Sequence, residues 1–264
     1  MILDVEEVPI KIPNWDSKLD GLKVAVVGDI HAGMPFFEDR RVRKIVDKIN
    51  SLKPDIVLLV GDYVNGGWYQ SAMDLKKLGG YLGEIKAPLG AYAILGNHDY
   101  LYGAGEIRKM INSTGIKLLE NSNAKVKTPK GDFYVSGIAD PLSADYSYSQ
   151  ALGGIEKNAP VIFLSHTPDV FREIPSEVGV TFSGHTHGGQ VRLPFIGALH
   201  ADNDMLPRGG WFPAEEYLSG LHEVNATYQY VSTGLGAAHR TPFRFRLWNT
   251  PQISLIKLTR KLDA

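Results

Sequence analysis

Short apolar runs alternate with amphipathic stretches in the first half of the chain. The runs at 22–27, 56–60 and 91–95 have the length and composition of buried β-strands. Residues 38–52 carry valine and isoleucine at helical spacing between the first two runs, and 71–85 is expected to form the next helix. Strands that alternate with helices in this way predict parallel βαβ units.

The second half of the chain is richer in predicted strands. Beyond residue 115, extended runs are expected at 125–128, 133–138, 161–164, 179–182, 228–232, 243–247 and 253–258, and helices near 148–157 and 168–174. An extended edge segment at 5–12, interrupted by Pro9, precedes all of these elements. No interval has the composition of a linker. The pattern therefore predicts a single domain over residues 1–264, an α/β fold with two packed sheets flanked by helices.

Residues 194–222 form the least regular stretch of the chain. The sequence leaves two interpretations of this stretch open. In the first it is a surface loop that packs on its own small core. In the second it is a cap or substrate loop over the active site, or a contact with a membrane or a partner.

The composition limits which partners and which metal ligands are possible. A net charge of -1 leaves no broad basic surface for nucleic acid, so an anionic ligand would have to be bound locally. The lack of cysteine excludes thiolate ligands and leaves oxygen and nitrogen donors for any metal. No apolar run approaches the ~18 residues of a transmembrane segment, and residues 1–13 do not have the pattern of a signal peptide. We therefore expect a cytoplasmic protein, with peripheral membrane association left open.

Five short motifs rich in metal-binding side chains each follow an apolar, strand-like run. They are Asp29-Ile30-His31, Gly61-Asp62, Gly96-Asn97-His98-Asp99, Ser165-His166 and Gly184-His185-Thr186-His187-Gly188-Gly189-Gln190. Each motif taken alone has a structural interpretation, as a surface turn, a helix cap or a buried structural histidine. Taken together at strand ends, they predict a site for two divalent metals.

The expected roles of the ligands follow from their chemistry and spacing. Asp29 and His31 would face one ion if the strand end is extended, because residues i and i+2 then point to the same side. Asp62 would lie at the carboxyl end of a parallel strand, where its two oxygens could bridge two metals. His185 and His187 flank Thr186 in a glycine-rich turn rather than an extended strand, and this turn is expected to send their rings apart, so they could serve different metals.

The histidine of the Asn-His-Asp motif is better suited to proton transfer than to metal binding. Asn97 offers a neutral carbonyl oxygen for a site that already holds negative charge, and His166 follows the 161–164 run at another strand end. His98 is the expected general acid, and Asp99 is expected to accept its other ring N–H and fix the tautomer. The alternative for this motif is a capping and turn cluster.

This set of motifs, in this order, resembles the calcineurin-like metallophosphoesterase superfamily over about residues 22–258. The 184–190 run with its continuation through 194, and the segment 232–236, are similar to the bacterial YaeI/YkuE-type phosphodiesterase branch, which includes a UDP-diacylglucosamine pyrophosphohydrolase. The resemblance implies a four-layer α/β/β/α sandwich with two mixed sheets. One metal would be held by Asp29, His31, Asp62 and His187, and the other by Asp62, Asn97, His166 and His185.

The implied cofactors are two divalent metal ions, with Mn or Fe expected first and Zn, Co or Ni as alternatives. They would activate a bridging water for attack on phosphorus, while His98 protonates the leaving oxygen. The expected substrate is a small phosphodiester or nucleotide-like molecule. Two alternatives stay open: a pyrophosphohydrolase that acts on a lipid-linked nucleotide sugar, and a non-catalytic scaffold on the same fold.

Further cationic side chains could bind a second anionic group of the substrate, because guanidinium groups suit phosphate. These candidates are Arg192, Arg208, His239 and Arg240. Arginines that are merely solvated at the surface are the alternative interpretation for each of them.

Overall fold

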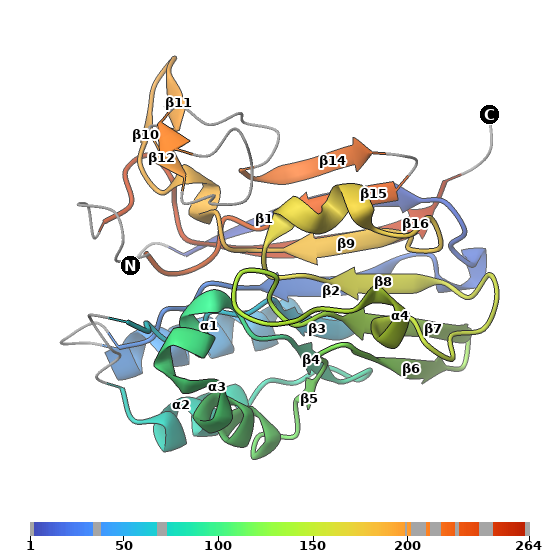
Figure 1. Cartoon of the computed structure of the whole chain (residues 1–264), viewed down its shortest axis with the longest axis horizontal. Helices are drawn as coiled ribbons and strands as arrows, with labels where there is room; N and C mark the ends of the chain where they lie inside the picture. Colours follow the sequence, from blue (N-terminus) through green and yellow to red (C-terminus); the bar gives the residue numbers. More distant parts are fainter. Residues whose placement is uncertain are drawn as a thin grey trace.

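Two six-stranded mixed sheets stack face to face in the computed structural model (Figure 1). The structure describes residues 3–33, 38–67, 73–198, 200–201, 210–211, 218–224, 227–237 and 245–261. The first sheet has the strand order β1-β16-β2-β3-β4-β5, and the second has the order β14-β15-β9-β8-β7-β6. Each sheet combines parallel and antiparallel neighbours, with the parallel strands β2-β3-β4 and β7-β8-β9 in the interior.

The strands of the first sheet are β1 (Asp4–Ile12), β2 (Leu22–Val27), β3 (Ile56–Leu59), β4 (Ala91–Ala93), β5 (Lys117–Leu118) and β16 (Gln252–Arg260). Those of the second are β6 (Ser122–Thr128), β7 (Gly131–Gly137), β8 (Val161–Leu164), β9 (Val180–Ser183), β14 (Gly220–Val224) and β15 (Thr227–Val231). Two small hairpins pair β10 (Arg192–Leu193) with β11 (Gly197–Ala198), and β12 (His200–Ala201) with β13 (Gly210–Trp211).

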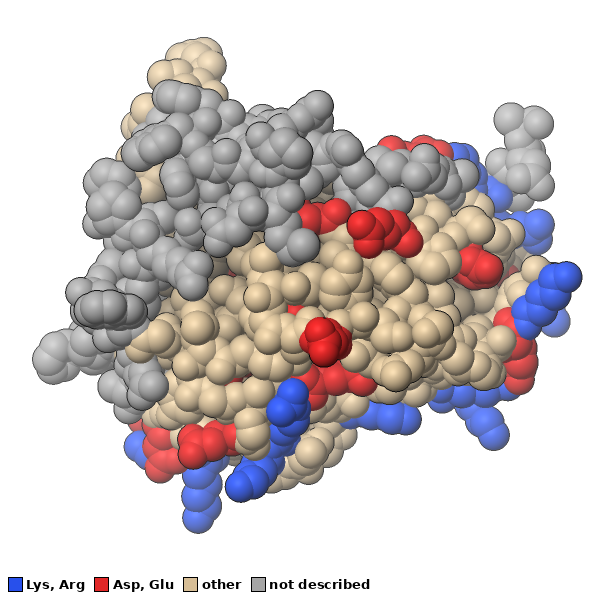
Figure 2. Space-filling view, in the orientation of Figure 1, with Lys and Arg blue, Asp and Glu red and all other residues tan. Residues whose placement is uncertain are grey.

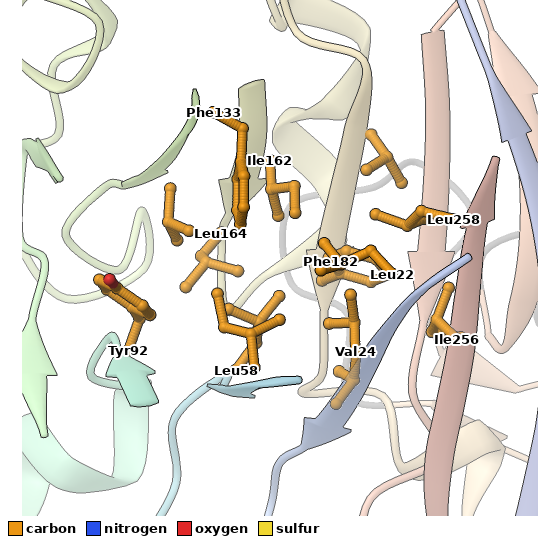
Figure 3. Close-up of a cluster of buried hydrophobic side chains, with 14 of the residues drawn as sticks. Leu22, Val24, Leu58, Tyr92, Phe133, Ile162, Leu164, Phe182, Ile256 and Leu258 are labelled. Atoms are coloured by element: carbon orange, nitrogen blue, oxygen red, sulfur yellow. The ribbon is translucent and has the colours of Figure 1, made fainter. Parts of the chain in front are cut away.

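Side chains from the facing surfaces of the two sheets form the central core (Figure 3). Val24 of β2 and Leu58 of β3 pack in the same fully buried cluster as Ile162 of β8 and Phe182 of β9. Successive side chains of a strand point to opposite faces, so the intervening residues of β2 and β3 face outward, toward helices. The strands are apolar on both faces for this reason, and the predicted buried strands are confirmed.

Helices cover the outer face of each sheet. The helices α1 (Glu38–Leu52), α2 (Leu75–Leu82) and α3 (Asn97–Asn112) pack on the first sheet through an apolar cluster that includes Val42 and Ile45. On the second sheet, α4 (Tyr148–Ala151) and the 3-10 helix η2 (Pro168–Glu173) contribute Ala151 and Val170 to a smaller cluster. The four-layer α/β/β/α sandwich is confirmed, with a thin outer layer on the second sheet.

Several elements differ from the expected ones. The helix α3 was not predicted, because glycines interrupt its apolar pattern; at one of them, Gly103, φ is 139° and the helix is kinked. The helix expected over 148–157 ends at Ala151, since two glycines follow shortly after. Of the strand expected at 243–247, the described part forms only an isolated bridge through Leu247.

The single domain over residues 1–264 remains a prediction. Much of the predicted cap at 194–222 lies outside the described residues, namely 199, 202–209 and 212–217. The described part of that stretch contributes β11 to β13 and the beginning of β14. Within the described ranges, no helix is long and apolar enough to span a membrane.

Candidate metal centre

Seven side chains predicted as metal ligands meet at one edge of the two stacked sheets. In the first sheet they follow β2, β3 and β4, and in the second they follow β8 and β9. All seven are buried, and they are Asp29, His31, Asp62, Asn97, His166, His185 and His187. Since the carboxyl ends of these parallel strands share one edge, residues separated by more than 150 positions become neighbours.

Asp62 lies at the middle of this cluster. Its Oδ2 atom is 3.5 Å from Nε2 of His31 and 3.3 Å from Nε2 of His166. Its Oδ1 atom accepts a hydrogen bond from the backbone N–H of His98 at 2.9 Å. One carboxylate oxygen therefore stands between two imidazole groups that come from different sheets, which is the position of a bridging ligand.

The other donors divide into two groups around Asp62. On one side, Nε2 of His187 lies 3.0 Å from Nε2 of His31 and 3.8 Å from Oδ1 of Asp29. The ligand atoms of Asp29, His31 and His187 all lie within 4.8 Å of one another, as a metal site requires.

On the other side of Asp62, the side-chain oxygen of Asn97 joins two imidazole rings. Its Oδ1 atom is 3.1 Å from Nε2 of His166 and 3.1 Å from Nδ1 of His185. The structure therefore brings all seven predicted ligands together. The ligand atoms of Asp29, Asp62 and His166 also lie within 4.8 Å of one another, so the two implied sets are not separate in space.

In two of these rings, the nitrogen that faces away from the cluster lies at hydrogen-bond distance from an oxygen acceptor. Nδ1 of His31 is 2.8 Å from Oδ1 of Asn65, and Nδ1 of His166 is 2.7 Å from the carbonyl oxygen of Val60. An acceptor there places the ring proton on Nδ1 and leaves the Nε2 lone pair directed into the cluster. Asn65 was not identified from the sequence, although it lies only three residues beyond Asp62.

The backbone at the site is strained. Five of the seven predicted ligands have positive φ angles that non-glycine residues rarely adopt. These angles are 51° at Asp29, 45° at His31, 57° at Asp62, 73° at His185 and 52° at His187. The extended strand end expected for Asp29 and His31 is therefore wrong, and a left-handed turn brings them together instead. Such conformations cost about 1–3 kcal/mol each and cluster at functional sites.

Two glycines permit the close approach of backbone to the carboxylates. A Cβ atom at Gly96 would lie 2.3 Å from Oδ1 of Asp62. At Gly234, where φ is 69°, a Cβ atom would lie 2.7 Å from Oδ2 of Asp29. Any larger residue at either position would displace a carboxylate of the cluster.

Burial dominates the electrostatics of the cluster. It raises the pKa of Asp29 to about 7 and holds the pKa of His31 and of His187 well below the usual range. Burial alone would also raise the pKa of Asp62, but His166 and His98 outweigh it, and that pKa lies well below its usual range. Burial would also lower the pKa of His166, but Asp62 outweighs it and raises that pKa well above its usual range. The imidazole groups of the site thus differ: the pKa shifts favour the neutral form of His31 and His187 and the charged form of His166.

The donor set fits divalent cations. Within the described part of the chain, Oδ2 of Asp29 is buried and has no hydrogen-bond partner. A buried carboxylate oxygen without a partner is costly. A cation bound among these oxygen and nitrogen donors would remove that cost.

The expected contact between Asp99 and the ring of His98 is wrong. Asp99 accepts hydrogen bonds from the backbone N–H groups of Asp62 (2.8 Å), Tyr63 (2.9 Å) and Gly96 (2.9 Å). Among the described residues, Nδ1 of His98 has no partner. Asp99 is the third residue of α3, so its carboxylate reaches back to the N-cap and across to the loop after β3. Its role is to fix the turn that carries Asp62.

The position of His98 is compatible with more than one role. Its ring packs edge-on against the ring of His31, with centroids 4.7 Å apart. One nitrogen lies close enough to His31 and Asp62 that the three could also hold a metal ion. These contacts fit both proton donation and metal binding by His98, and a variant at this position distinguishes the two roles.

The weaker candidates are only partly within the described residues. Arg192 is half-buried, and its Nη1 atom donates to the carbonyl oxygen of Gly188 at 3.1 Å. The other three, Arg208, His239 and Arg240, lie outside the described residues.

A guanidinium group that the sequence did not reveal lies against the site. Nη2 of Arg246 is 3.2 Å from Nδ1 of His187 and 2.6 Å from the carbonyl oxygen of Thr233. Burial lowers the pKa of Arg246 to about 10. No local motif marks Arg246, because only the fold brings it to His187.

Comparison with known proteins agrees with this geometry. The family model described as calcineurin-like phosphoesterase matches residues 22–189, and the chain belongs to this family of metallophosphoesterases. The chain is 28% identical, over 97% of its length and 86% of the relative, to the metallophosphoesterase YkuE of Bacillus subtilis. It is 28% identical, over 78% of its length and 71% of the relative, to the phosphodiesterase YaeI of Escherichia coli. The resemblance to the YaeI/YkuE branch is confirmed.

The name of a third relative gives a lipid-linked nucleotide sugar as its substrate. The chain is 26% identical, over 97% of its length and 89% of the relative, to the UDP-2,3-diacylglucosamine pyrophosphatase LpxG of Chlamydia trachomatis. The chain spans about half the length of the animal relatives that it matches. Among solved structures, NAD nucleotidase NadN of Haemophilus influenzae has a similar fold, with a TM-score of 0.51 and 16% identity over 80% of this chain and 50% of that chain.

Proposed function

We propose that this protein is a phosphodiesterase that uses two divalent metal ions. The observation that carries the proposal is the position of Asp62, whose Oδ2 atom stands 3.5 Å from His31 and 3.3 Å from His166. A carboxylate between two sets of buried donors suits a pair of cations that act on one phosphoryl group. Family membership supports phosphoester hydrolysis, and the relative YaeI supports a diester substrate.

In this proposal each cation has its own set of donors. One would be held by Asp29, His31, Asp62 and His187, and the other by Asp62, Asn97, His166 and His185. Mixed oxygen and imidazole ligands suit Mn, Fe, Zn, Co or Ni, and the family resemblance places Mn or Fe first. Bound there, the cations would neutralise the charge on the phosphoryl oxygens and activate a water molecule.

His98 would supply the proton for the leaving oxygen. Its backbone N–H is bonded to Oδ1 of Asp62, so the residue is held in register with the centre of the site. Its Nδ1 atom is buried and has no partner within the described part of the chain, so a substrate oxygen could supply the missing one. General acid catalysis of this kind contributes about 10²–10⁴-fold to the rate.

A small phosphodiester or nucleotide-like molecule is the proposed substrate. The second candidate is a lipid-linked nucleotide sugar cleaved at its pyrophosphate, and the similarity to LpxG over 97% of the chain favours it. A non-catalytic scaffold is disfavoured. Every position predicted to bind metal or to donate a proton carries a side chain that can do so, and these side chains meet in one buried cluster.

The test compares bis-p-nitrophenyl phosphate with p-nitrophenyl phosphate after chelation and after Mn²⁺ is restored. We expect diester cleavage that chelation abolishes and Mn²⁺ recovers. The Asp62→Asn variant is the control, since it should lose activity by about 10²-fold or more when both cations are misplaced. Diester cleavage that survives chelation, or that Asp62→Asn leaves intact, would overturn the proposal.

A further inference from the structure

Four acidic side chains are buried among the described residues, and the metal centre accounts for three of them. Asp29 and Asp62 are predicted ligands, and Asp99 accepts hydrogen bonds from the backbone of the turn after β3. The fourth is Asp140, in the loop after β7. Charged side chains at the surface, such as those coloured in Figure 2, are in contact with water. Asp140 has no exposed surface, so its carboxylate needs another source of stabilisation.

Two hydroxyl groups bind the carboxylate of Asp140. Oγ1 of Thr167 donates to Oδ1 at 2.8 Å, and Oγ of Ser143 donates to Oδ2 at 2.7 Å. Within the described part of the chain no lysine or arginine pairs with this carboxylate. Burial accordingly raises the pKa of Asp140, and the nearby charge of His166 opposes that shift. Two neutral donors offset only part of the cost of burying a charge.

The contact with Thr167 links Asp140 to the metal centre, because Thr167 directly follows the predicted ligand His166. The same short segment is fixed by two further bonds. Oγ of Ser165 donates to the carbonyl oxygen of Thr167 at 2.8 Å, and the backbone N–H of Gly184 donates to the carbonyl oxygen of His166 at 3.0 Å. Since β7 and β8 are parallel neighbours, the loops that carry Asp140 and His166 leave the same edge of the second sheet.

The two proposed cations are unequally supplied with negative charge. The ligand set of the first includes two carboxylates, Asp29 and Asp62. The set of the second shares Asp62 and adds only an amide and two imidazole groups, those of Asn97, His166 and His185. A buried cation needs negative charge nearby, and a buried carboxylate needs positive charge. Asp140 and the second cation would meet each other's need.

We propose that Asp140 is a positioning residue for the second cation. It would not touch the cation; its negative charge, placed beside the segment that carries His166, would raise the affinity of the site. The inference rests on the proposed pair of cations. Groups that support a metal ligand without binding the metal typically change its affinity by about 10–100-fold. The alternative is a purely structural role, since the carbonyl oxygen of Asp140 also closes a turn by accepting from the backbone N–H groups of Ser143 and Ala144.

The test is calorimetric titration of the metal-free full chain with Mn²⁺. Asp140→Asn removes the charge but can keep both hydrogen bonds, because the serine hydroxyl can accept as well as donate. We expect the wild type to bind two Mn²⁺ ions and Asp140→Asn to bind the second about tenfold or more weakly, with the first unchanged. Asn97→Ala, which lacks a ligand of the second cation, identifies the signal of that ion.

Two further variants serve as controls. Asp145→Asn makes the same change on an exposed side chain of the same loop, and it should bind both ions as the wild type does. Thr167→Val breaks the hydrogen bond to Asp140 but leaves the charge in place. It should therefore weaken the second ion less than Asp140→Asn does, whereas a structural role predicts that both variants weaken it equally.

Three results would overturn the proposal. They are an unchanged affinity for both ions in Asp140→Asn, an equal weakening by Thr167→Val, and an Asp140→Asn variant that loses the circular dichroism spectrum of the folded chain, which would assign Asp140 to the fold. A wild type that binds fewer than two Mn²⁺ ions would contradict the proposed pair of cations itself. The wild-type titration thus distinguishes failure of the proposed function from failure of the role of Asp140.

Discussion

Arg246 donates a hydrogen bond to the ring of His187, with Nη2 3.2 Å from Nδ1. The corresponding nitrogen of His31 and of His166 meets an oxygen acceptor instead. Arginine is always protonated, so Nδ1 of His187 must be the acceptor in this contact. A hydrogen-bond acceptor at the ring nitrogen that does not bind metal strengthens an imidazole ligand, whereas a donor at that nitrogen does not. The two halves of the site are therefore unequal.

For the proposed pair of metal ions, this inequality predicts that the two ions leave at different chelator concentrations. The ion beside His187 and Asp29 should be removed first, at a concentration about tenfold or more below that needed for the other. Metal content measured by mass spectrometry along a chelator titration checks this order. Asp29→Asn should lack the early step and Asn97→Ala the late one. Simultaneous loss of both ions from the wild type would contradict the prediction.

His98→Ala should lower turnover of a diester by about 10²–10⁴-fold while the metal content stays the same. The physical reason is that the leaving oxygen would lose its proton donor and the ligands would keep theirs. His222→Ala is the matched control, since among the described residues that ring bonds to the nearby carbonyl oxygen of Ser219, at 2.9 Å, and lies outside the site. Loss of metal from His98→Ala would show instead that His98 is a ligand.

Asp99→Ala should lower the free energy of unfolding and leave proton transfer by His98 largely unchanged. The change leaves four buried backbone N–H groups without their acceptor, those of Asp62, Tyr63, Gly96 and, at 3.4 Å, Val64, at about 1–3 kcal/mol each. Urea unfolding in buffer with Mn²⁺ measures the loss. A variant with wild-type stability and reduced turnover would restore the original hypothesis, in which Asp99 acts through His98.

Gly234→Ala should weaken metal binding without changing the packing of the hydrophobic core. The added Cβ atom would lie 2.7 Å from Oδ2 of Asp29, and φ at this position is 69°, which alanine adopts only with strain. We expect weaker metal binding, seen as a lower metal content after dialysis. Gly220→Ala is the control, because it has a φ of 89° but nothing within 4 Å of the added atom. Equal metal loss in both variants would attribute the effect to backbone strain alone.

Glu120 should make stability depend on pH. Burial would raise its pKa, but hydrogen bonds from Arg108 (2.7 Å) and Tyr100 (2.6 Å) outweigh it and lower the pKa. A carboxyl group with a lowered folded-state pKa stabilises the fold above its unfolded pKa of about 4.3, and this stability is lost as the pH falls through the folded value.

Glu120→Gln should therefore cost about 1–2 kcal/mol at neutral pH and less at about pH 3, measured by urea unfolding. Glu156→Gln is the control. Its ion pair with Lys125, at 2.8 Å, is exposed to solvent and should contribute little to stability. An equal cost of Glu120→Gln at both pH values would contradict the assignment.

The sequence by itself determined the layers and the set of candidate ligands. Apolar runs of strand length predicted β2, β3, β8 and β9, because a strand that is buried on both faces has to be apolar throughout. Polar residues placed directly after those runs could be identified as site candidates, since parallel strands end at a common edge. Both inferences rest on short stretches of chain, where pattern and chemistry are local.

Only the tertiary structure decided how the ligands face one another and what holds them. The left-handed turns at Asp29 and His31, the capping role of Asp99 and the contact of Arg246 with His187 all depend on backbone from distant strands. The helix α3 escaped prediction for a related reason. Its glycines weaken the local helical pattern, and packing on the first sheet supplies the stability that the pattern lacks.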